Sequence, residues 1–128
     1  MQITVPISVG ELLDKITILE IKAERIADPD KRINVARELS ELTRRRDALG
    51  LGRPDLAPLV TALGQVNRRL WEVEDDLRRL EKKQEFGRAF VALARAVYRE
   101  NDRRAEIKRE INRLTGSHLV EEKSYSAG

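Results

Sequence analysis

The chain has 128 residues, of which 37% are charged and only 4% are aromatic, and it contains no cysteine. This length supports one domain around one shared core, and the lack of cysteine excludes disulfides and cysteine-ligated zinc. The net charge of +3 is uneven, since residues 1–43 carry −2 and residues 44–116 carry +6, so we expect an anionic partner to bind the middle and late part of the chain.

Residues 1–7 alternate apolar and polar side chains, which predicts a short extended arm, with Pro6 tolerated because the arm would form an edge strand. They lack the basic region and apolar run of a signal peptide. No stretch approaches the about 20 apolar residues that cross a bilayer. We therefore expect a cytoplasmic bacterial protein that does not insert into membranes.

A first helix is predicted over residues 8–27. Ser8 and Glu11 have the spacing of a capping box, and Asp14 places a negative charge near the positive end of the helix dipole. Apolar residues fall on more than one face of this helix, which is typical of a central helix.

A second helix is predicted over residues 29–49, because Asp28 can cap it and Pro29 suits its first position. Two long helices follow, over residues 55–85 and 87–115, separated by a break at Phe86 and Gly87. We predict a single all-α domain over residues 1–128. It is expected to be a bundle of about four helices in two hairpins, with the two long helices antiparallel and with a short C-terminal arm over residues 117–128.

The two long helices differ in their seams, the lines of heptad positions that face a neighbouring helix. The first fills every heptad position with apolar residues: Leu56, Leu59, Leu63, Val66, Leu70, Val73, Leu77 and Leu80. The second keeps this spacing except at Glu100 and Arg104. Buried charges are costly, so these two residues form a surface ion pair, mark a helix break, set the register, or belong to a polar binding site. If they only interrupt the seam, replacing both by leucine should be neutral or stabilising.

Basic residues suggest a second kind of surface. One face of the last helix carries Arg88, Arg95, Arg99 and Arg103, and the helix before it adds Arg68, Arg69, Arg78 and Arg79. Such faces could follow nucleic-acid phosphates. Acidic residues interleave with them and few aromatics are available for base stacking, so a solvated, salt-bridged face is the preferred interpretation.

Two acidic pairs, Glu38 with Glu41 and Glu72 with Asp75, each lie one helical turn apart. Four carboxylates meeting across a bundle could bind Mg²⁺. The pairs resemble, distantly, the acidic motifs of all-α nucleotide pyrophosphohydrolases, and this resemblance implies a small Mg²⁺-dependent enzyme as an alternative. The preferred interpretation contains no metal or other cofactor.

Three segments carry a closer resemblance: residues 7–26 (ISVGELLDKITILEIKAERI), residues 70–76 (LWEVEDD) and residues 101–117 (NDRRAEIKREINRLTGS) with the tail at residues 119–125 (LVEEKSY). Together they resemble a family of small bacterial proteins whose function is uncharacterised. The two long motifs lie at opposite ends of the chain, and in a bundle they can meet. That meeting would form a ligand site from Lys15, Lys22, Glu100, Asn101, Arg104 and Lys108.

In such a site the cations would bind phosphate or carboxylate groups, and the other side chains would orient them. The site requires the first helix to lie within about 8–10 Å, one Debye length, of Arg104. We expect a non-enzymatic module that binds a protein partner or a second copy through its helix faces. The alternatives are a small ligand-binding or enzymatic bundle for a nucleotide or sugar-nucleotide, and a nucleic-acid-binding protein.

Overall fold

The computed structural model describes residues 1–117, and in that range it is all-α with no strand. The helices are α1 (Val9–Arg25), α2 (Pro29–Ala48), α3 (Ala57–Lys82) and α4 (Arg88–Thr115). The predicted helical bundle is confirmed, and each helix lies within the range predicted for it. The expectation of an edge strand in residues 1–7 is wrong, because these residues form neither a strand nor a bridge. The expected C-terminal arm lies, apart from Ser117, outside the described residues.

Local sequence signals account for the helix ends. The Ser8 hydroxyl accepts a hydrogen bond from the Glu11 backbone N–H at 3.1 Å, and Asp28 accepts from two N–H groups at the start of α2. The helix α4 ends at Gly116, whose φ of 63° is the left-handed conformation that glycine adopts without strain. The capping box at Ser8 is only half formed, because the Glu11 carboxylate binds Lys108 of α4.

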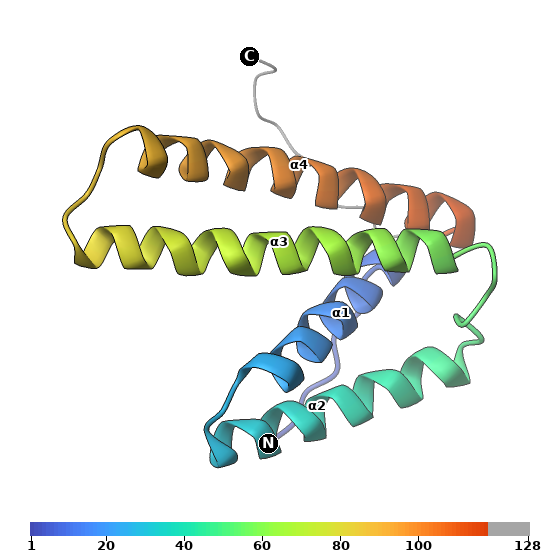
Figure 1. Ribbon diagram of the computed structural model, residues 1–128. Helices are drawn as coiled ribbons and strands as arrows, with labels where there is room; N and C mark the ends of the chain where they lie inside the picture. Colours follow the sequence, from blue (N-terminus) through green and yellow to red (C-terminus); the bar gives the residue numbers. More distant parts are fainter. Residues whose placement is uncertain (118–128) are drawn as a thin grey trace.

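The helices form two hairpins, α1 with α2 and α3 with α4, which diverge from each other in a V (Figure 1). The helix α1 contacts the three other helices, whereas α2 contacts α1 alone within the described part of the chain. The helix α1 crosses the α3–α4 hairpin at the end where α3 begins and α4 ends (Figure 1). This is the central position that the apolar faces of the first predicted helix indicated.

The core lies at this crossing. Its buried cluster contains Leu12, Leu13, Ile16, Leu51, Leu56, Leu63, Val66, Ile107 and Ile111. Beyond it, residues 74–103 of the α3–α4 hairpin continue as a two-helix projection, which we call the extension. No side chain of the extension is fully buried, and Phe86, Val91 and Tyr98 are exposed. None of the described helices is both long enough and apolar enough to span a membrane.

Candidate functional site

The helix α4 runs without a break through the interruption of its heptad pattern, and Arg104 forms an ion pair across the core. The Arg104 Nε atom lies 2.9 Å from Oδ1 of Asp14 in α1, and a terminal guanidinium nitrogen contacts the other carboxylate oxygen. Asp14 is fully buried, whereas a quarter of the Arg104 side chain reaches solvent. The interruption is therefore an interhelical contact between α1 and α4.

The third helix completes this contact through Asn67. The Asn67 amide donates hydrogen bonds to Oδ1 of Asp14 at 2.9 Å and to the hydroxyl of Thr17 at 2.8 Å. Thr17 in turn donates to the backbone carbonyl of Asp14 at 2.8 Å. A buried carboxylate needs such partners, because an unpaired charge in the core is strongly unfavourable. We call Asp14, Thr17, Asn67 and Arg104 the junction network.

A second contact fixes the beginning of α1 against α4. The Lys108 ammonium lies 3.1 Å from the Glu11 carboxylate, and only 7% of the Lys108 side chain is exposed. The Gly10 N–H donates to the Asn112 side-chain oxygen at 2.7 Å. A Cβ atom at position 10 would stand 2.7 Å from the Lys108 backbone carbonyl, so only glycine permits this approach.

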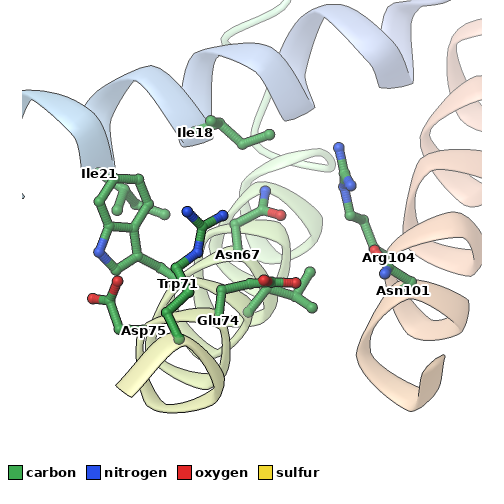
Figure 2. Close-up of a pocket in the computed structure, with 10 residues that line it drawn as sticks. Ile18, Ile21, Asn67, Trp71, Glu74, Asp75, Asn101 and Arg104 are labelled. Carbon is green, nitrogen blue, oxygen red and sulfur yellow. The ribbon is translucent and has the colours of Figure 1, made fainter. Parts of the chain in front are cut away.

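Beside the junction network is a pocket of about 520 Å³, which we call the crook pocket because it lies where α1 crosses the α3–α4 hairpin (Figure 2). It is lined by Ile18, Ile21, Asn67, Leu70, Trp71, Glu74, Asp75, Arg78, Asn101 and Arg104. In Figure 2, Arg104 reaches from α4 toward α1, while the Trp71 indole stands near Ile21. The pocket thus combines an apolar floor and an aromatic wall with charged groups of both signs.

The structure brings part of the predicted ligand set together. Asn101 and Arg104 line the crook pocket, and Lys108 lies one turn further along α4 in its pair with Glu11. Lys15 lines a different hollow, between α1, α2 and the N-terminal residues. Lys22 and Glu100 are partly buried and lie outside the lining of the crook pocket. The contact of 2.9 Å between α1 and Arg104 meets the distance requirement of the hypothesis.

These ion pairs change what the site can bind. The charges of Arg104 and Lys108 are each balanced by a carboxylate of α1, so they are poorly placed to neutralise a phosphate. Arg78 lines the pocket without an ion pair among residues 1–117. An anionic ligand would therefore find one uncompensated cation beside two carboxylates, Glu74 and Asp75.

The alternative Mg²⁺ site is not formed. Glu38 and Glu41 lie on α2 and Glu72 and Asp75 lie on α3, and these two helices do not touch. In the described part of the chain, no group of three or more potential metal-binding side chains gathers. Glu41 instead pairs with two arginines of its own helix, and Glu72 pairs with Arg25 at 3.6 Å.

An exposed ion pair joins α1 to α3 on another edge of the crossing. Both terminal nitrogens of Arg68 donate to the Glu24 carboxylate, at 2.6 and 2.8 Å. These hydrogen bonds lower the pKa of Glu24 below its usual value. The geometry is bidentate, which favours a well-defined orientation over a diffuse surface attraction.

The sequence pattern does not predict the roles of Asp14 and Asn67 in the junction network. It indicates Asp14 only as a partner of the helix dipole, and it gives no signal for Asn67. A usable signal existed for Asp14, because it lies between Leu13 and Ile16 in a helix whose apolar residues surround it. A carboxylate in such a helix is buried against a neighbour and then needs a cation.

Comparison with known proteins gives a family but no described activity. The chain matches no curated protein and no solved structure. The resemblance of the sequence motifs to an uncharacterised family has a counterpart in one family match, which covers residues 3–128. Because this match spans nearly the whole chain, the protein belongs to the family of unknown function DUF6165.

Proposed function

We propose that this protein is a non-enzymatic interaction module that binds a protein partner through the crook pocket and the extension. The observation that carries the proposal is the group of exposed apolar side chains on the extension. From residue 74 to residue 103 no side chain is fully buried, and 48% of Phe86, 51% of Val91 and 70% of Tyr98 is exposed. Large apolar side chains gathered on one projection are typical of a surface that another protein covers.

The junction supports this role because it holds the extension in one direction. Asp14, Asn67 and Arg104 join α1, α3 and α4 through oriented hydrogen bonds. Oriented polar contacts in a core define one arrangement more sharply than apolar packing does. A preorganised surface loses less conformational entropy when a partner binds.

Site-specific photo-crosslinking tests the proposal. A photoreactive phenylalanine analogue in place of Tyr98 should give a protein adduct, and the same analogue in place of the exposed Ala36 on α2 is the matched control. The purified partner should bind the wild-type chain at least about tenfold more tightly than the Val91→Asp variant. Equal adducts at positions 98 and 36, or none at either, would refute an interaction surface on the extension.

A second candidate function is binding of a small ligand in the crook pocket. Its volume of about 520 Å³ lies within the range of ligand pockets, and Trp71 offers a stacking surface. Titration calorimetry with nucleotides and sugar-nucleotides, with and without Mg²⁺, tests this candidate. Saturable heat that disappears in the Trp71→Ala variant would favour it, and flat titrations would exclude these ligand classes.

A further inference from the structure

We infer that the partner of this surface is a second copy of the chain, packed so that a basic strip on α4 of each copy covers the acidic wall of the crook pocket of the other. The inference rests on the proposed function and names its partner.

The basic strip lies on the exposed side of the extension. It consists of Arg88, Val91, Arg95 and Tyr98, whose spacings of three, four and three residues place them on one face of α4. All four side chains are exposed. Residues 88–99 contain three arginines and no carboxylate. Among residues 1–117, Arg88 and Arg95 have no ion-pair partner.

The acidic wall lies on α3. Trp71, Glu74 and Asp75 line the crook pocket, and neither carboxylate forms an ion pair within the described range. Residues 71–85 contain six acidic and four basic side chains, a net charge of −2. Arg78 also lines the pocket and partly offsets this charge. The wall thus offers an indole and two carboxylates to a strip that offers apolar side chains and two guanidinium groups.

The apolar half of the strip lies on the pocket side of the hairpin, and its arginines lie at the outer edge of α4. Asn101 of α4 lines the pocket, and Tyr98 and Val91, three and ten residues earlier, lie within about 80° of it around the helix. Arg95 and Arg88 lie about 120–140° from Asn101, at the rim of the surface that the second copy would cover. A two-fold axis that lies in the interface and runs along the hairpin turns this side of the second copy toward the first and places α4 of each copy on α3 of the other. Because α3 ends at Lys82 and α4 begins at Arg88, the antiparallel strip and wall lie at the same height of the hairpin, so each strip then meets the wall of the other copy, as a two-fold interface requires.

The dimensions agree with this arrangement. From Arg88 to Tyr98 the strip spans about 15 Å, and from Trp71 to Lys82 the wall spans about 17 Å, at about 1.5 Å per residue. The whole extension is about 22 Å long, from residue 88 to residue 103, and its two helices are together about 20 Å wide, so it covers about 450 Å² on each copy. The total of about 900 Å² is at the small end for protein interfaces, so we expect a reversible dimer with a Kd in the micromolar to millimolar range.

A charge-swap experiment tests the pairing. Sedimentation equilibrium up to about 1 mM should show a monomer–dimer equilibrium for the wild-type chain. The variants Glu74→Arg/Asp75→Arg and Arg88→Glu/Arg95→Glu should each raise the Kd at least about tenfold, because each places like charges opposite one another. An equimolar mixture of the two variants should form a heterodimer, since both of its contacts again join opposite charges.

The control variant Arg69→Glu/Lys83→Glu changes the net charge as much as Arg88→Glu/Arg95→Glu does. Its two positions are exposed and lie on the other side of α3, and it should dimerise like the wild-type chain. Circular dichroism checks that each variant is helical. Misfolded variants would also not regain dimer formation when they are mixed, so recovery on mixing excludes misfolding as the cause of the weaker dimers.

A wild-type monomer at about 1 mM, or variants that do not recover on mixing, would overturn the inference. If the monomer still gives an adduct with another protein at position 98, the proposed function survives and only the identity of the partner is wrong. Association with nucleic acid, steeply weakened by salt and lost in Arg88→Glu/Arg95→Glu, would also overturn the inference.

Discussion

The substitution Arg104→Leu tests whether the ion pair with Asp14 joins the helices. In this variant the buried Asp14 carboxylate keeps its hydrogen bond from Asn67 but loses its cation. Removing one partner of a buried ion pair costs about 3–5 kcal/mol. The free energy of unfolding of a domain is about 5–15 kcal/mol, so this loss is a large fraction of the total. We therefore expect a clearly lower urea midpoint.

The paired substitution Asp14→Leu/Arg104→Leu separates the ion pair from its surroundings. It removes both charges and leaves apolar side chains, which often match or exceed a buried ion pair in stability. The Asn67 amide then lacks one acceptor, at a cost of about 1–3 kcal/mol. We expect the paired variant to regain most of the stability that Arg104→Leu loses, with a coupling energy of at least about 2 kcal/mol in the double-mutant cycle.

Urea unfolding followed by far-ultraviolet circular dichroism measures Arg104→Leu, Asp14→Leu and the paired variant, provided that their m-values agree. A loss below about 1 kcal/mol in Arg104→Leu, or additive effects in the cycle, would refute the assignment of Arg104 as the counter-ion of Asp14. The structure also corrects the expectation for Glu100→Leu/Arg104→Leu. That variant leaves the buried Asp14 carboxylate without its counter-ion, just as Arg104→Leu does, so it should be destabilised and not neutral.

Two further predictions concern a pair of helical glycines and the exposed ion pair between α1 and α3. Gly10→Ala should lower the free energy of unfolding by about 1–3 kcal/mol, because its Cβ meets the Lys108 carbonyl. Gly64→Ala, where the added Cβ meets nothing within 4 Å, should raise it by about 0.5–1 kcal/mol; equal thermal melts would contradict both. Because Arg68 lowers the pKa of Glu24, the stability that this pair contributes is present above the pKa of the unfolded chain and is lost as the pH falls through the lowered value. The difference in Tm between wild type and Glu24→Gln should thus be full near pH 7 and shrink below about pH 4, and a pH-independent difference would contradict this.

Much of the fold was predictable because its signals are local. Ser8, Asp28 and Gly116 end or begin helices through their own side chains or backbone conformations. Apolar residues at heptad positions indicated which sides of α3 and α4 face each other. Neither signal needs knowledge of where a distant segment lies, and so the helices and the antiparallel hairpin followed from the sequence.

The site was only partly predictable, because it depends on which helices meet and at what height. The interruption at Arg104 indicated a position on α4 that needed a partner, but Asp14 lies 90 residues earlier in the chain. Helical periodicity places residues on a face and says nothing about the helix opposite that face. Of the cations in the predicted ligand set, Arg104 and Lys108 lie at the crossing, where carboxylates of α1 pair with both of them.

The buried ion pair between Asp14 and Arg104 is costly to desolvate, which suggests that it fixes the position of α1 on the α3–α4 hairpin. Leucine, isoleucine and valine side chains in the core tolerate many packings, so an all-apolar crossing could shift α1 along the α3–α4 hairpin with little loss of energy. A buried carboxylate has far fewer positions in which a guanidinium and an amide both reach it, as Arg104 and Asn67 reach Asp14. Because Ile18 and Ile21 of α1 form the floor of the crook pocket, a shift of α1 would change the shape of that pocket. The ion pair can therefore matter more for the binding surface than for the free energy of unfolding, which is the use of buried charge best attested in helical assemblies.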